Sequence, residues 1–201
     1  MKTIFLLLCL LLLTRTQLVA QPAWTASDKQ QLLANLRRTQ AEVTAETARL
    51  TPAQWNFREG TGKWTIGQVL EHLTMWELIT LSDARYALWM GPNTKVAALC
   101  RSDSAATSFI YEQTPHVSPD HTIPTGLVPG ANNLTIFNGK CDEIIRQIEQ
   151  NEVDFRQHVR LGKDDGSHRT LAQLYIIQYG HVDRHLRQIR RIKQQPGFLK
   201  L

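Results

Sequence analysis

The chain has 201 residues, of which 42% are hydrophobic, and its 23 lysines and arginines outnumber 18 acidic residues to give a formal net charge of +5. This length suits a single domain with a full hydrophobic core. The charge is mild and mixed along the chain, whereas nucleic-acid-binding domains usually carry a basic stripe interleaved with aromatic side chains. We therefore expect no nucleic-acid partner.

The first twenty residues have the layout of a secretory signal peptide. Lys2 supplies the basic start, residues 4–13 form a short apolar run, and Ala20 is a small residue at the expected cut. The run is too short for a transmembrane helix, which needs about 20 apolar residues, although an uncleaved anchor is the alternative. Cleavage would leave 21 basic against 18 acidic residues, a net charge of +3. We expect a bacterial periplasmic or secreted protein, with one domain over residues 21–201 and no stable membrane insertion.

Two cysteines, Cys100 and Cys141, remain after the expected leader. An oxidising compartment permits a disulfide between them. Pairing requires Cα atoms within about 7 Å of each other, which the sequence does not determine. The sequence therefore leaves both the paired and the reduced form open.

Four long stretches have the apolar spacing of amphipathic helices. The predicted helices cover residues 29–50, 65–90, 134–159 and 170–193. The expected N-caps of the first three are Ser27, Thr65, and Asn132 or Asn133. Gly91-Pro92 and Pro196-Gly197 end the second and fourth helices. No stretch shows the alternation that would predict a strand.

A long connection separates the second and third helices. It contains two predicted short helices, residues 95–100 and 105–112, and then a proline-rich loop over residues 114–130. So long a loop in a compact domain is often functional, or is a crossover between distant elements. Four long helices with one crossover predict an all-α four-helix bundle, an architecture that often holds a metal ion in its core.

Three histidines are candidates for such a metal site. His181 and His185 are four residues apart on the fourth predicted helix, so both lie on one face, one turn apart. Helical H-x-x-x-H pairs of this kind bind one metal ion in zinc enzymes. His72, on the second helix, is the best candidate for a third ligand. We interpret His116 and His121 as solvated loop residues, with a ligand or lid role as the alternative.

Two motifs resemble the signatures of a known family. Residues 63–73, KWTIGQVLEHL, resemble the early signature of the DinB-like (YfiT-like) superfamily of metal-dependent hydrolases, which is related to the bacillithiol and mycothiol S-transferases. Residues 171–175 and 181–189 resemble the late signature, in which H-x-x-R-H precedes a Gln-Ile pair. Pro124-Thr125-Gly126 is similar to one large subgroup. The resemblance extends from Ser27 to Lys193.

The resemblance implies an antiparallel four-helix bundle with a divalent metal ion, most often zinc or nickel, held by His72, His181 and His185. It also implies a small-molecule substrate and, for many members, a homodimer. In the thiol-transferase branch the metal activates a low-molecular-weight thiol. That branch is cytosolic, so the expected leader is a departure from it.

Several neighbours of the histidines receive provisional roles from helical geometry. Gln68 and Gln188 lie one turn from His72 and His185, where they could support the ligands through hydrogen bonds. No general base is obvious, because Glu71 and Asp183 each lie one or two positions from a ligand, and such positions on a helix point about 100° or more apart. The roles open to Arg184 are to hold an anionic substrate group or to cap a neighbouring helix.

A basic cluster occupies the end of the fourth helix. Its members are Arg184, Arg187, Arg190, Arg191 and Lys193. Positive charge there suits the helix dipole, and an anion- or membrane-binding patch is the alternative.

Three functions remain compatible with the sequence. The first is a metal-dependent hydrolase or thiol transferase, and the second is a non-catalytic metal- or ligand-binding bundle. The third is a structural bundle with three core histidines and no metal.

Overall fold

The computed structural model describes residues 23–112 and 117–200. The expected leader, its cut after Ala20, and His116 lie outside these residues. The α-helices are α1 (Ala26–Thr47), α2 (Pro52–Trp55), α3 (Ile66–Met90), α4 (Thr94–Ala97), α5 (Asp103–Tyr111), α6 (Gly130–Glu149) and α7 (Leu171–Lys193). Three 3₁₀ turns are η1 (Asp120–Thr122), η2 (Asp165–Ser167) and η3 (Phe198–Lys200), and two short strands are β1 (Val159–Arg160) and β2 (Arg169–Thr170).

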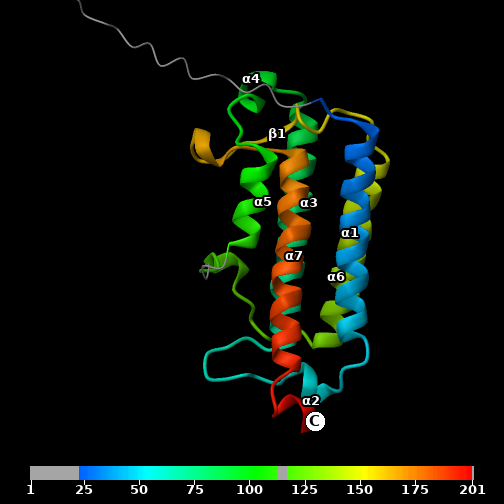
Figure 1. Cartoon of the computed structure of the whole chain (residues 1–201), viewed down its shortest axis with the longest axis vertical. Coiled ribbons are helices and arrows are strands. Elements are labelled where there is room, and N and C mark those ends of the chain that lie inside the picture. Colours follow the sequence, from blue (N-terminus) through cyan, green and yellow to red (C-terminus); the bar gives the residue numbers. More distant parts are fainter. Residues whose placement is uncertain (1–22, 113–116, 201) are drawn as a thin grey trace, which may run out of the picture.

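Four long helices form the predicted bundle, with α1 and α7 running one way and α3 and α6 the other (Figure 1). The chain leaves α3 at one end of the bundle and enters α6 at the opposite end, so residues 91–129 must cross its full length. The shorter helix α5 lies on this path and packs along α7. Of the helices within the described residues, none has both the length and the hydropathy needed to cross a bilayer.

Capping boxes fix where three of the four long helices begin. Thr65 caps α3 and Thr170 caps α7, and each threonine exchanges hydrogen bonds with the glutamine three residues later. The starts predicted for these helices are thereby confirmed. The predicted cap of the first helix was wrong, because Thr25, paired with Asp28, occupies the N-cap and the helix begins at Ala26 and ends at Thr47.

The prediction for the third helix was wrong at both ends. The helix begins at Gly130 behind Pro129, and Asn133 instead donates to the carbonyls of Gly67 and Val128. It ends at Glu149, about ten residues early, because the chain turns there and places Phe155 against Trp24 and Tyr175 in the core. The short antiparallel pairing of β1 with β2 that follows was not predicted.

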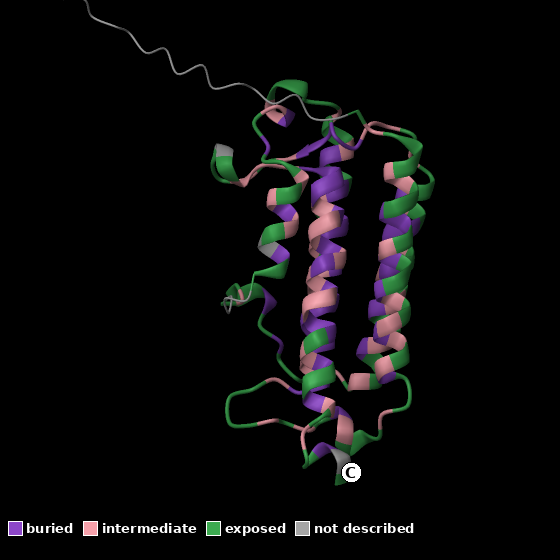
Figure 2. Cartoon of the chain, viewed as in Figure 1, coloured by how far each residue is buried: buried purple, intermediate pink, exposed green. Residues whose placement is uncertain are grey.

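The inward faces of the long helices are buried along their whole length (Figure 2). They form two apolar clusters, one around Phe155 and Tyr175 and one around Phe137 and Leu186. On α3 and α7 these clusters are separated by buried polar side chains, which include Glu77, Thr80 and Gln178. The core is therefore two apolar halves divided by a polar layer.

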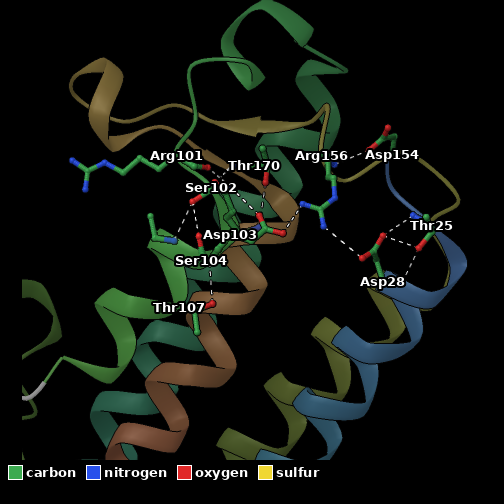
Figure 3. Close-up of polar contacts among 12 residues, drawn as sticks. Thr25, Asp28, Arg101, Ser102, Asp103, Ser104, Thr107, Asp154, Arg156 and Thr170 are labelled. Atoms are coloured by element: carbon green, nitrogen blue, oxygen red, sulfur yellow. Dashed lines mark hydrogen bonds and ion pairs between the residues drawn. The ribbon is translucent and has the colours of Figure 1, made fainter. Parts of the chain in front are cut away.

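Arg156, in the segment after α6, joins the starts of two helices (Figure 3). Its Nη1 lies 2.6 Å from Asp103 Oδ2 in the first turn of α5, and its Nη2 lies 3.5 Å from Asp28 Oδ1 in the first turn of α1. The guanidinium also lies 6.0 Å from the ring centroid of Trp24. These contacts hold α5 against the bundle at its upper end.

The open questions about the cysteines and the basic cluster have structural answers. No disulfide joins Cys100 and Cys141, and both are buried.

At the end of α7, Arg190 pairs with Glu42 and Glu46 of α1, and Lys193 also pairs with Glu46. Two members of the cluster therefore tie α7 to α1, a role that was not predicted from the sequence, and the interaction with the helix dipole stays a prediction.

Gly180 allows α5 to approach α7 closely. A Cβ at this position would lie 2.4 Å from two carbons of Ile110. We expect Gly180→Ala to lower the free energy of unfolding by about 1–3 kcal/mol, because the close-packed α5 must shift to accommodate the methyl group. Urea unfolding monitored by circular dichroism measures this change.

Gly139 provides the matched control. It lies on α6, and a Cβ there would meet nothing within 4 Å. Gly139→Ala should raise the free energy of unfolding by up to about 1 kcal/mol, through helix propensity alone. Stabilisation by both substitutions would contradict the close packing of α5 on α7.

Candidate metal centre

The structure brings the three predicted histidines together. His72 comes from the first half of α3, and His181 and His185 come from the middle of α7, which packs against α3. One ring nitrogen from each histidine lies within 4.8 Å of the other two. His72 and His185 are buried and His181 is half-buried. The i, i+4 spacing therefore places the pair on the face of α7 that meets α3.

The Nε2 atoms face one another. His181 Nε2 lies 3.2 Å from His72 Nε2 and 3.0 Å from His185 Nε2. The ring centroid of His72 lies 5.1 Å from that of His181 and 4.9 Å from that of His185. The centroids of His181 and His185 are 4.6 Å apart. The imidazoles thus present their Nε2 lone pairs toward a common point.

Oxygen acceptors fix the opposite ring nitrogens of two histidines. The Nδ1–H of His72 donates to the carbonyl oxygen of Thr122 at 2.7 Å, and the Nδ1–H of His185 donates to Oε1 of Gln188 at 2.8 Å. These bonds place the ring proton on Nδ1 and leave Nε2 as an electron-pair donor. Metal-binding histidines are commonly oriented in this way.

Two of the three histidines, His72 and His185, are held in the neutral form that binds a metal. Burial lowers the pKa of His72, and burial with the nearby His72 lowers the pKa of His185 to about 3. A protonated imidazole has no lone pair on Nε2, so a low pKa keeps the donor available at neutral pH.

The donor set fits a divalent cation. Nitrogens about 2.0–2.1 Å from a tetrahedral zinc ion lie roughly 3.3 Å from each other, close to the two Nε2 separations observed. With the Nδ1 protons of His72 and His185 assigned, His181 Nε2–H could donate to only one of its two neighbours. The second Nε2–Nε2 contact would then bring two lone pairs together. A cation between the rings accepts an electron pair from all three Nε2 atoms and removes this conflict.

The crossover is clamped beside the site. The carboxylate of Glu71, on α3, accepts hydrogen bonds from the backbone N–H and hydroxyl of Thr125 and from the N–H of Gly126. Gly126 has φ +75°, a left-handed conformation that glycine adopts at low cost. Together with the Thr122–His72 bond, this clamp gives the Pro-Thr-Gly motif a structural role, which is to seat the loop over the site.

The roles assigned to neighbouring residues are partly confirmed. Gln188 supports His185 as predicted, but the prediction for Gln68 was wrong, because its side chain completes the capping box of Thr65. Asp183 faces away from the site and pairs with Arg38 of α1. Arg184 donates to the carbonyl of Glu112, the C-cap of α5, so it takes the capping role.

The loop histidine within the described residues makes no part of the cluster. His121 is exposed, and the metal-site group contains only His72, His181 and His185 among the described residues. Thr122, the next residue, contributes its backbone carbonyl instead. Helical spacing gives no signal for this contact, because Thr122 is fifty residues from its partner.

A cavity of about 320 Å³ opens beside the three histidines. Its other walls are Trp64, Trp76, Ile110, Val117, Ser118, Pro119, Ile177, Gln178 and Arg184. The Trp64 ring lies 5.0 Å from His72, and the Trp76 ring lies 5.6 Å from His181. Such a concave, mostly apolar pocket with a few polar groups is typical of small-molecule sites.

The fold and the site define a four-helix bundle with a three-histidine centre beneath an apolar cavity. The family model of the DinB superfamily matches residues 35–189, and the chain belongs to this superfamily, as the sequence resemblance predicted. Among solved structures, the chain is similar to YfiT from Bacillus subtilis, described as a probable metal-dependent hydrolase with an unusual four-helix bundle topology. The two chains are 14% identical with a TM-score of 0.54, over 88% of this chain and 92% of YfiT. No curated protein sequence matches the chain.

Proposed function

We propose that this protein is a metal-dependent enzyme in which His72, His181 and His185 hold one divalent cation, zinc or nickel, and that it acts on a small molecule by hydrolysis or thiol transfer. The convergence of three Nε2 atoms carries this proposal. Three protein nitrogens leave a coordination position open, as in catalytic zinc sites. The similar protein YfiT is itself described as a probable metal-dependent hydrolase, which supports the same class of activity.

The residues around the site have separable tasks. A divalent cation supplies Lewis acidity and lowers the pKa of a bound water or thiol. Thr122 and Gln188 orient two of the imidazoles, and Trp64 and Trp76 line the cavity with apolar rings. Arg184 holds the end of α5 at the cavity rim.

Among the described residues that line the cavity there is no carboxylate. Glu71 and Asp183 are both engaged elsewhere, so neither serves as a general base. This observation favours a second candidate function, a non-catalytic bundle that binds a metal ion or an apolar ligand. The expected leader favours hydrolysis over transfer of a cytosolic thiol.

Elemental analysis and a substrate screen test the proposal. Protein purified without a histidine tag should contain about one divalent ion per chain. Ester, amide and thiol-adduct substrates should then be compared with the native protein and His72→Ala. Turnover lost in the variant supports the enzyme, whereas metal without turnover supports the binding module. No metal under any loading condition would exclude both.

Gln188→Leu should weaken metal binding about 10- to 100-fold, because His185 loses the acceptor that fixes its ring and tautomer. Competition with a chromophoric zinc chelator measures the affinity. Gln194→Leu, at the exposed end of the same helix, is the control and should leave the affinity unchanged. Equal affinities in the two variants would show that the Gln188 contact does not support the site.

A further inference from the structure

One buried polar side chain lies in the wall of the cavity. Gln178 is 2% exposed and belongs to the polar layer that divides the core. It precedes His181 by three residues, so its side chain lies one helical turn from the metal centre on the same face of α7. Its position is therefore inside the cavity but beyond direct contact with the cation.

Two residues of α3 hold the carboxamide of Gln178. Its Nε2 donates to Glu77 Oε1 at 2.6 Å, and its Oε1 accepts from Thr80 Oγ1 at 2.8 Å. Both partners are buried, at 1% and 2% exposure. The amide is thereby fixed in one orientation by groups on the opposite helix.

This arrangement leaves hydrogen-bonding capacity unused. A carboxamide nitrogen carries two N–H groups, and only one of those on Gln178 has a partner among the described residues. Burying polar groups without partners costs stability, so native cores rarely retain them. A second buried N–H beside a cavity is explained if a ligand accepts from it.

The remaining walls restrict what that ligand can be. Two tryptophans and four aliphatic or proline side chains give the cavity apolar sides, and no carboxylate among the described lining residues offers a partner for a cation. Arg184, a cationic side chain in the described part of the wall, donates to the carbonyl of Glu112 and keeps its positive charge. A molecule with an apolar body and no positive charge matches this surface.

We propose that Gln178 is a substrate-binding residue that donates a hydrogen bond to a carbonyl group of the substrate, with Glu77 and Thr80 as its positioning residues. The substrate class is a largely apolar small molecule that carries no positive charge. This molecule presents one polar group to the metal and carries a carbonyl group at a distance of about one helical turn from that polar group. This inference rests on the proposed metal-dependent function.

Matched hydroxamates on the cobalt-loaded full chain test the inference. The hydroxamate group binds the metal, and the probes are benzohydroxamates that carry an acetyl or an isopropenyl group at the meta or para position. The two substituents have the same shape, but only acetyl accepts a hydrogen bond. At one ring position or both, the native protein should bind the acetyl probe about fivefold more tightly, the worth of one net hydrogen bond. Changes in the cobalt absorption spectrum measure both affinities.

Three variants assign the preference to particular residues. Gln178→Leu should abolish the acetyl preference while the affinity for cobalt is unchanged. Glu77→Gln keeps an oxygen acceptor for the Gln178 amide and should retain the preference, whereas Glu77→Leu should reduce it. A purely structural role for Glu77 would lower stability without changing the ratio of the two probe affinities.

The outcomes separate this inference from the function on which it rests. Equal binding of acetyl and isopropenyl probes by the native protein, at both ring positions, would overturn the role of Gln178 and leave the metal centre intact. A preference for the acetyl probe that persists in Gln178→Leu would likewise overturn the role of Gln178 and leave the metal centre intact. Failure of the native protein to bind cobalt would overturn both proposals.

Discussion

Replacing His185 by alanine is expected to weaken binding of zinc by about a hundred- to a thousandfold. Zinc bound by four protein ligands in small domains contributes about 10–16 kcal/mol. Loss of one of four ligands therefore removes roughly 2.5–4 kcal/mol, which corresponds to about a hundred- to a thousandfold in affinity. The effect should exceed that of Gln188→Leu, since His185 supplies the electron pair itself and Gln188 only orients the ring.

The matched control for His185→Ala is His121→Ala, which removes an exposed imidazole from the crossover loop. The metal content and zinc affinity of His121→Ala should equal those of the native protein. Chelator competition gives the affinities, and circular dichroism confirms that both variants keep their helices. A His185→Ala variant that binds zinc as tightly as the native protein would rule out the three-histidine centre.

The parts of the structure that follow from local rules could be predicted from sequence. Helices α3 and α7 begin after threonines that are followed three residues later by glutamine, a local spacing typical of a capping box at a helix start. Helix α3 also ends at the predicted Gly91. The pairing of His181 with His185 depends only on the helical repeat. These features need no knowledge of the rest of the molecule.

The errors arose where tertiary contacts override local pattern. Val153 and Phe155 continue the apolar spacing of α6, yet the helix ends at Glu149 and Phe155 reaches the core from a turn. Lys29 of α1 donates to the carbonyls of Glu149 and Asn151 and so stabilises this ending from another helix. Such a contact spans about 120 residues, and helical periodicity carries no information about it.

The environment of the histidines was predictable only in part for the same reason. Gln188 is local to His185 and was identified, but the partner of His72 is the carbonyl of Thr122, which the crossover brings into place. The link between Glu77 and Gln178 joins two helices far apart in sequence. Their residue types suggest no partnership until α3 and α7 are packed together.

The second prediction with a large expected effect concerns the buried carboxyl group of Glu77. Its side chain is 1% exposed, Oε1 accepts one hydrogen bond, and Oε2 has no hydrogen-bond partner among the described residues. Burial raises the pKa of this carboxyl from its ordinary 4.5 to about 7. The charged form is thus disfavoured in the folded protein, because no cation among the described residues pairs with Glu77, and its contacts with Gln178 and Cys141 only partly compensate for the lost hydration.

A raised carboxyl pKa makes stability fall as pH rises. Below about pH 4.5 the carboxyl is protonated in both the folded and the unfolded chain, and it contributes no difference. Between that pH and about 7 the unfolded chain ionises first, so the folded state loses about 1.4 kcal/mol per pH unit. The total loss contributed by Glu77 is about 3 kcal/mol, and it is complete above the folded-state pKa.

Glu77→Gln should remove this pH dependence, because glutamine keeps an oxygen acceptor for Gln178 and cannot ionise. With metal removed by a chelator, we expect the variant to match the native protein within about 1 kcal/mol near pH 5 and to exceed its free energy of unfolding by about 3 kcal/mol at pH 8. Urea unfolding at the two pH values measures the difference, and Glu152→Gln, at a side chain 87% exposed, is the control with no such change. If the difference between Glu77→Gln and the native protein were the same at pH 5 and pH 8, the carboxyl would have to ionise in the folded protein near its ordinary pKa. The polar layer of the core would then hold a charged Glu77, for which the structure offers no compensating cation among the described residues.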